Sequence, residues 1–275
     1  MFNTLEDLQR ILLEIKNNSY TIPSNIDFNY LVNLMIKNIG HIDPVVRDDL
    51  IYSILSYLIV RTDKLNNKLS DILEICLDDD HLFYKIGEVG TDSIFTRSFS
   101  MLLLATIIYN HRKNNIFSHD EVVRAYGKVK EYFKAEKDLR GFVEKKGWAH
   151  AVAHSADTLD EFALCSEIDV NDLKDLLQIF KDKICEGEYT YINEEDERLV
   201  TAVTTILSRK LITEEYFIDW IKEFTQFNKK GIYPYDSNLK INIKNFLRSL
   251  YFRLLPLENM DNYIETISKT LTLIQ

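Results

Sequence analysis

The chain has 275 residues, of which 46% are hydrophobic and 28% are charged, and it contains only eight glycines and four prolines. So few turn-forming residues exclude a turn-rich β fold and favour long helices. The formal net charge of −10 at pH 7 disfavours nucleic acid as a partner, because an acidic surface repels phosphate groups.

The cysteines and the apolar runs indicate where the protein resides. Cys76, Cys165 and Cys185 are an odd number, lie far apart and form no Cys-x-x-Cys pair, which suits reduced thiols in a cytoplasm. The N-terminal MFNTLEDLQRILLEIK carries acids at helical spacing, so we expect a first helix there and no signal peptide. The runs LIYSILSYLIV and MLLLATIIY are about half of the roughly 20 residues that cross a bilayer, and no membrane span is expected.

Apolar residues recur at helical spacing almost throughout, beginning with Leu5, Leu8 and Ile11. After this first helix the pattern predicts helices at about 27–39, 44–60, 66–78, 93–113, 118–135, 146–166, 169–185, 193–210, 213–227, 237–254 and 258–273. Two of these helices have start signals. Asp43-Pro44 is a helix cap followed by proline at the first position, and Ser118 with Glu121 is a capping box. The glycine-containing stretch 77–91 is expected to be a loop or one distorted helix.

The connections between these helices are short and contain no proline-rich or Gly/Ser-rich linker. We therefore expect one continuous all-helical domain over 1–275. Helix pairs recur about every 45 residues, near the period of HEAT repeats, and HIDPVVRDDLIYSILSYLIV resembles the second helix of such a repeat. The predicted fold is all-α, a HEAT-like solenoid of paired antiparallel helices, with a compact multi-helix bundle as the alternative.

The stretch GWAHAVAHSADTLDEF, residues 147–162, has an unusual helical pattern. At about 100° per residue, His150, His154, Asp157 and Glu161 fall on one stripe. The opposite side is a core face of mostly small residues, and these are Ala149, Val152, Ala156, Leu159 and Ala163.

Three interpretations of the histidine stripe stay open. It is a solvated polar face, or His150, His154 and Asp157 bind a divalent metal, or the histidines form a metal-free pocket in which Asp157 sets an imidazole tautomer. HAVAH lacks the general-base Glu of HExxH, which excludes a zincin protease. Just before the stripe, Asp138 and Arg140 precede two glycines that bracket a short element, and this segment can fold over the histidines with Trp148 as a wall.

The segment DLRGFVEKKGWAHAVAHSADTLDEF resembles a family of proteins known as domain of unknown function 2785. RSFS at 97–100, Glu195 with Arg198-Leu199, and FLRSLYFRL at 246–254 extend the resemblance over most of the chain. The resemblance implies a soluble, bacterial, cytoplasmic protein and implies no reaction, cofactor or catalytic residue.

The same segments contribute four arginines, Arg97, Arg140, Arg198 and Arg248. If these arginines converge near the histidines, they can bind a carboxylate or a phosphate. The alternative is that they form salt bridges between helices.

No phosphate loop, serine nucleophile elbow or calcium loop occurs in the sequence. Scattered lysines do not outweigh the acid excess, which disfavours a DNA glycosylase. The leading hypothesis is a non-catalytic helical-repeat scaffold that binds a protein or peptide. The alternative is an enzyme or a binder of an anion, metal or other small ligand, with a pocket formed by Asp138, Arg140, Trp148, His150, His154, Asp157, Glu195, Arg198 and Arg248.

Overall fold

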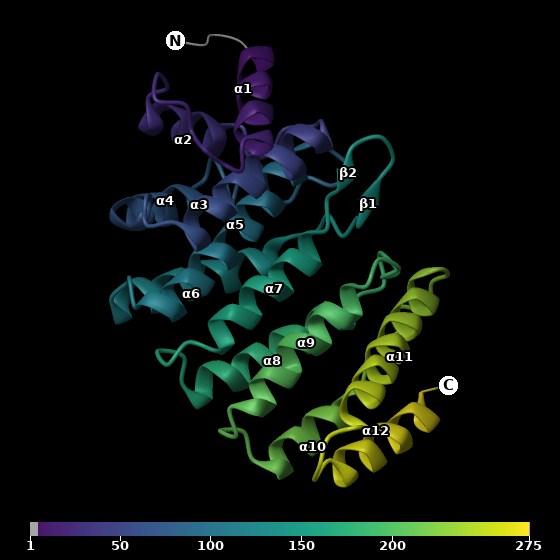
Figure 1. The fold of residues 1–275 in the computed structure, drawn as a ribbon. Helices are drawn as coiled ribbons and strands as arrows, with labels where there is room; N and C mark the ends of the chain where they lie inside the picture. The colour runs from purple at the N-terminus through teal and green to yellow at the C-terminus, as the bar shows by residue number, and fades with distance from the viewer. Residues whose placement is uncertain (1–4, 275) are drawn as a thin grey trace. The chain divides into compact units, whose positions relative to one another are not determined.

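The computed structural model describes residues 5–274, and over this range the chain is mostly helical, which confirms the all-α class (Figure 1). Residues 1–4 of the predicted first helix lie outside the described residues. The described helices are α1 (Leu5–Asn17), α2 (Phe28–Lys37), α3 (Ser53–Arg61), α4 (Leu69–Cys76), α5 (Ser93–Asn114), α6 (His119–Ala135), α7 (Ala151–Ala163), α8 (Val170–Ile184), α9 (Glu195–Ser208), α10 (Glu214–Lys222), α11 (Tyr235–Leu254) and α12 (Asp261–Leu273). They are joined by a π-helical segment η1 (Val45–Tyr52), by the 3₁₀ turns η2 (Asn66–Lys68) and η3 (Glu223–Thr225), and by the short strands β1 (Phe142–Val143) and β2 (Gly147–Trp148).

Most predicted helices have a counterpart within a few residues, and the start signals act as expected. Glu121 accepts hydrogen bonds from the backbone N–H and the hydroxyl of Ser118, at 2.8 and 2.7 Å, before α6. The Asp43 carboxylate accepts from the Val45 N–H at 2.8 Å at the start of η1. The predicted helix 44–60 is therefore helical, but its first half has π-helical hydrogen bonding.

The prediction of a helix over 146–166 is wrong at its start. Gly147 and Trp148 form strand β2, and α7 begins only at Ala151. The Ala149 N–H donates to the Gly141 carbonyl at 2.8 Å, and the His150 N–H donates to the Arg140 carbonyl at 3.0 Å. These bonds to the preceding segment hold the backbone in the hairpin, because an N–H that is already engaged there cannot join a helix.

The chain divides into two compact units. The first consists of the residues up to Glu121 together with Ala135–His154, and the second of Val122–Lys134 together with the residues from Ser155 onward. The single continuous domain expected over 1–275 stays a prediction. Among the described helices, none is long and apolar enough to cross a bilayer.

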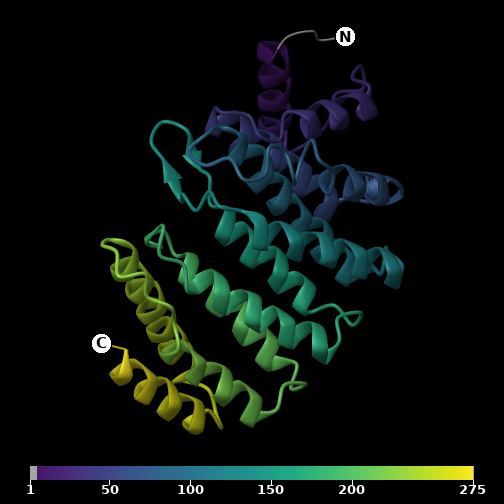
Figure 2. The same ribbon diagram turned by 180° about the vertical axis from the view of Figure 1, so that it is seen from behind.

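In the first unit the long helix α5 packs against α3 and α4 (Figure 2). Most of its residues are buried, from Ile94 to His111, so α5 is enclosed on all sides. One of its buried residues is Arg97, whose side chain has no solvent exposure. A charge in this position needs partners inside the protein, since burying an unpaired charge is very costly.

In the second unit, helices contact others two positions further along the chain. The Tyr126 hydroxyl of α6 donates to the Asp172 carbonyl of α8 at 3.0 Å, and the Trp220 indole of α10 donates to the Leu177 carbonyl of α8 at 2.9 Å. Helix α10 packs in turn on α12. The even-numbered helices of this unit thus form one continuous series of contacts.

The odd-numbered helices of the second unit form a matching series. The Arg198 guanidinium of α9 donates to the Asp157 carboxylate of α7 at 3.2 Å, and the Ser249 hydroxyl of α11 donates to Asp196 of α9 at 2.8 Å. Figure 1 shows α9 and α11 side by side, and they share the most extensive helix packing of this unit. The odd-numbered helices of this unit thus also contact one another in their order along the chain.

The buried partner of Arg97 is Glu136, which follows α6. The Arg97 guanidinium donates to the two Glu136 oxygens at 2.6 and 3.1 Å, and both side chains are almost fully buried. It also donates to the carbonyls of Tyr84 and Lys85 at 3.0 and 3.3 Å, and to the Glu88 carbonyl at 3.2 Å. One guanidinium thus ties the loop after α4 to the segment after α6.

Replacing Arg97→Met is expected to lower the free energy of unfolding by about 3–5 kcal/mol, because the buried Glu136 carboxylate loses its countercharge. Chemical denaturation at pH 7 measures the change. The exposed pair of Arg253 with Glu197 is the matched control, and Arg253→Met should cost only about 0–1 kcal/mol. A second change, Glu136→Leu, should restore part of the loss in the Arg97 variant. Equal losses in the Arg97 and Arg253 variants would contradict the role assigned to burial.

Candidate functional site

The two glycines of the segment 141–147 bracket a β-hairpin. In its antiparallel register Phe142 lies opposite Trp148 and Val143 lies opposite Gly147. The turn needs residues with positive φ, and Lys145 and Gly147 have φ of 65° and 78°. A Cβ on Gly147 would lie 2.8 Å from the Pro44 Cβ, so only glycine lets this strand come so close to the start of η1.

The hairpin is anchored by Arg47, a fully buried residue of η1. Its Nη1 donates to the His41 carbonyl at 2.8 Å and its Nη2 donates to the Lys146 carbonyl at 2.8 Å. The guanidinium also lies 4.3 and 4.6 Å from the ring centroids of Phe95 and Phe99 on α5, at cation–π distance. Arg47 therefore holds the turn before η1, the hairpin and α5 together.

A row of aromatic and imidazole rings runs from the hairpin into the core of the first unit. Successive ring centroids in this row are 5.1, 4.7, 5.7, 5.2 and 6.3 Å apart. In order, the rings are Phe142, Trp148, His150, His154, Phe99 and Tyr52. The two predicted histidines are thus brought together with Trp148, as the sequence suggested.

The histidines reach this arrangement by different backbone conformations. His150 precedes α7 and has a φ of 51°, while its carbonyl accepts from the His154 N–H at 2.9 Å. His154 is only 7% exposed, so it does not lie on a solvated face. Its Nδ1 lies 3.1 Å from the Ser98 carbonyl, and because a carbonyl can only accept, Nδ1 carries the proton of this bond. The five residues expected on the core face are all buried, including Ala149 and Ala163.

Asp138 and Arg140 pair with each other and with the loop before α5. The Arg140 guanidinium donates to the two Asp138 oxygens at 2.8 and 2.6 Å, and Asp138 is fully buried. Asp138 also accepts from the Gly90 N–H at 2.9 Å, and Arg140 donates to the Thr91 carbonyl at 2.7 Å. Two predicted site residues therefore form a neutral pair that fixes a loop.

The other predicted site residues belong to the second unit. Asp157 of α7 accepts from Arg198 of α9, so these two form an ion pair. Glu195 is buried at the start of α9, where burial raises the pKa of its carboxyl, while the hydrogen bond from the Asn193 N–H acts in the opposite direction. Arg248 is exposed on α11.

The three proposed metal ligands have partners of other kinds. His154 meets the Ser98 carbonyl, and Asp157 is engaged by Arg198. His150 stacks on Trp148 with an interplanar angle of 20°. A divalent metal held by these residues stays a prediction.

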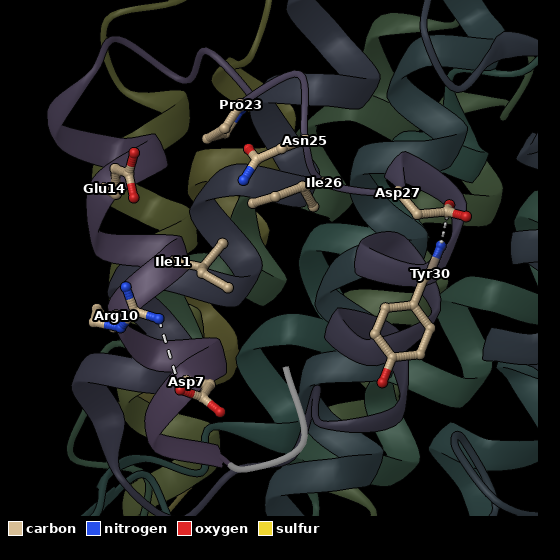
Figure 3. Close-up of a pocket in the computed structure, with 9 residues that line it drawn as sticks. All are labelled: Asp7, Arg10, Ile11, Glu14, Pro23, Asn25, Ile26, Asp27 and Tyr30. Carbon is tan, nitrogen blue, oxygen red and sulfur yellow. Dashed lines mark hydrogen bonds and ion pairs between the residues drawn. The ribbon is translucent and has the colours of Figure 1, made fainter. Parts of the chain in front are cut away.

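A cavity of about 580 Å³ in the first unit lies between α1 and the segment that enters α2 (Figure 3). Its lining contains the ion pair of Asp7 with Arg10 and the helix cap in which Asp27 accepts from the Tyr30 N–H. Figure 3 shows Ile11 and Glu14 on α1, and Asn25 on the segment that enters α2. None of the predicted site residues lines this cavity.

The sequence analysis missed a group of exposed apolar residues on the hairpin and next to it. Phe142 is 55% exposed and Trp148 is 40% exposed, and their rings meet edge to face with centroids 5.1 Å apart. The adjoining turn exposes Ile42 and Val45. We call these four residues the hairpin platform. In the sequence, the pair Gly141 and Gly147 was the signal for a hairpin. Phe142 and Trp148 lie opposite each other on its two strands, which places both side chains on one face.

Comparison with known proteins yields one match. The model of a family described as "Protein of unknown function (DUF2785)" matches residues 82–252, a range that contains the hairpin and every ring of the row except Tyr52. No curated protein and no solved structure matches the chain.

Replacing Gly147→Ala should destabilise the protein by about 2–4 kcal/mol, because the new Cβ combines an unfavourable positive φ with a clash against Pro44. Thermal or urea denaturation measures this. The control is Gly87→Ala, where φ is 95° and no atom lies within 4 Å, so that only the backbone cost of about 1 kcal/mol is expected. Equal effects at both glycines would show that the close approach to Pro44 is not a constraint.

We expect the stability of the protein to depend on pH through the carboxyl of Asp48, next to Arg47. Burial raises its pKa from 3.8 to about 6, even though the Arg47 guanidinium at 2.7 Å favours the ionised form. Between pH 4 and 6 the folded state therefore binds more protons here than the unfolded state. This group's contribution to the free energy of unfolding falls as the pH rises through that window and stays low above it.

In Asp48→Asn this contribution is absent. The stability of the variant relative to the wild type should therefore increase by up to about 3 kcal/mol between pH 4 and pH 7. Denaturant titrations at several pH values measure the difference. Asp49→Asn removes a neighbouring, mostly exposed carboxylate and is the control. A difference between Asp48→Asn and wild type that does not change with pH would refute the assignment.

Proposed function

We propose that this chain, which belongs to the DUF2785 family of proteins of unknown function, is a non-catalytic module that binds a segment of a partner protein. The observation that carries the proposal is the exposed pair of Phe142 and Trp148 on a hairpin whose backbone is anchored by Arg47. Large aromatic side chains dominate the binding energy of protein interfaces when they are already held in position.

The platform is held in place before any partner arrives. Trp148 stacks on His150, whose ring meets His154, and His154 is tied to the Ser98 carbonyl. The indole is thereby ordered on its inner side while part of it stays in contact with water. Binding a partner on this indole costs little side-chain entropy, which supports a role as an interaction anchor.

We propose that the bound segment is basic and carries an apolar residue beside its positive charge. The chain has a net charge of −10, which attracts cationic segments over distance. An Arg or Lys side chain can place its cation over the exposed indole of Trp148, while the apolar neighbour contacts Phe142, Ile42 or Val45. An acidic segment would gain neither interaction.

The proposal includes a HEAT-like array of helix pairs rather than a compact bundle. The contacts between helices two positions apart in the second unit, such as α9 with α11 and α10 with α12, support it, because successive repeats of a helical array contact one another in this way. A repeat array offers extended surfaces to a partner protein. We also propose a cytoplasmic location, which the three free cysteines support.

An enzyme or small-ligand pocket built on the histidines is the weaker proposal. Asp138 and Arg140 neutralise each other, and Asp157 pairs with Arg198, so these charges are engaged within the protein. A catalytic role would need them to exchange those partners for a substrate.

Peptide display against the purified full chain tests the proposal. Selected peptides should be enriched in Arg or Lys next to an apolar residue, and Trp148→Ala or Phe142→Ala should weaken the best peptide by about tenfold or more, the effect of losing an aromatic hot spot. Raising the salt concentration should weaken it further. Fluorescence anisotropy with the labelled peptide measures these affinities.

The matched control is Phe252→Ala, which removes an exposed phenylalanine of α11 in the second unit. Its affinity for the peptide should equal that of the wild type. Peptides that bind the Trp148 and Phe142 variants as tightly as the wild type, or a selection that favours acidic sequences, would refute the proposed platform.

A further inference from the structure

A second cavity of the first unit, of about 630 Å³, is lined by α2, α4, α5 and the loop after α4. This volume is in the range that proteins use to bind small molecules. Its polar lining residues are Asn33, Lys37, Asp80, His81, Tyr84 and Thr96. The cavity shares no residue with the hairpin platform, so a ligand bound in it is independent of the proposed function.

The loop after α4 forms one wall of this cavity. It is held by hydrogen bonds to residues that do not line the cavity. The Asp78 carboxylate accepts from the Asp80 N–H at 2.9 Å and meets the His81 Nδ1 at 2.8 Å. The buried Arg97 donates to the Tyr84 carbonyl at 3.0 Å. The positions of Asp80, His81 and Tyr84 are therefore set before a ligand binds, which reduces the entropy lost on binding.

The opposite wall is held by a close approach of two backbones. A Cβ on Gly40, just after α2, would lie 2.4 Å from the Thr96 Cα of α5. Only glycine allows this contact, which brings the C-terminal end of α2 against α5. Lys37 belongs to the last turn of α2, so its position relative to Thr96 is also set.

The lining combines two opposite charges with hydroxyls and an apolar surface. Lys37 on α2 offers an ammonium, and Asp80 on the loop offers a carboxylate. Because Asp78 engages Nδ1 of His81, the nitrogen left to meet a ligand is Nε2. Ile36 and Ile75 supply the apolar part.

We propose that this cavity binds a small zwitterion, a free amino acid or a dipeptide. Lys37 would bind its carboxylate, Asp80 and the acceptor Nε2 of His81 would bind its amino group, and Ile36 with Ile75 would contact its apolar part. A phosphate-like dianion fits less well, because Asp80 and Asp78 repel it, and a polyamine is repelled by Lys37. The opposite charges in the lining thus favour a ligand that carries one charge of each sign.

Thermal-shift screening of the full chain with the twenty L-amino acids and a panel of dipeptides tests this site, followed by calorimetric titration of the best probe. At least one probe should bind with a Kd below about 1 mM. The matching carboxylic acid without the amino group, and the amine without the carboxylate, should each bind about tenfold more weakly or worse. Lys37→Met and Asp80→Asn should each weaken the probe by about 10- to 100-fold, the loss expected for a charge-assisted hydrogen bond.

The matched controls are Lys64→Met and Asp79→Asn, which remove the same charges from exposed residues outside the lining. They should bind the probe as the wild type does, and circular dichroism should show that all four variants are folded. Trp148→Ala should also keep the affinity, which separates this site from the platform. The proposal is overturned when no probe binds, when either half-analogue binds as well as the zwitterion, or when the lining variants bind no worse than their controls.

Discussion

A buried guanidinium must have its N–H groups matched by acceptors, and this constraint shapes the first unit. Arg47 and Arg97 are both fully buried. Arg47 donates hydrogen bonds to the carbonyls of His41 and Lys146. Arg97 donates to the Tyr84 carbonyl and the Glu136 carboxylate. Segments that would otherwise be independent loops are thereby fixed on α5, including the hairpin and the cavity wall.

The same constraint separates the charged residues that hold the loops of the first unit from its exposed apolar residues. The charges that the family match contains, such as Arg97, Asp138 and Arg140, are engaged inside the protein and hold its loops. Beside them, Phe142 and Trp148 stay in contact with water. Internal charges thus fix the backbone, and the apolar residues that we propose as the binding surface are different residues.

The second unit is built on a different principle. Its helices contact elements two positions apart, such as α9 with α11, and hydrogen bonds such as Ser249 to Asp196 join the same helices. Stability in such an arrangement is spread over neighbouring interfaces. In the first unit, buried charges also hold the loops, and the hairpin platform and the cavity lined by Lys37 and Asp80 lie in this unit.

The sequence by itself determined the helices, their caps and the buried alanine face of α7, because these depend on periodicity and on residues within one or two turns. It also grouped Trp148, His150 and His154. Only the tertiary structure decided that His150 stands before the helix and that Phe142 and Trp148 share one exposed surface. Arg97 meets Glu136 across 39 residues and Arg47 meets Lys146 across 99, and no local pattern encodes such partners. Packing determines which residue pairs with a buried charge, because desolvation makes a buried charge without a partner unfavourable.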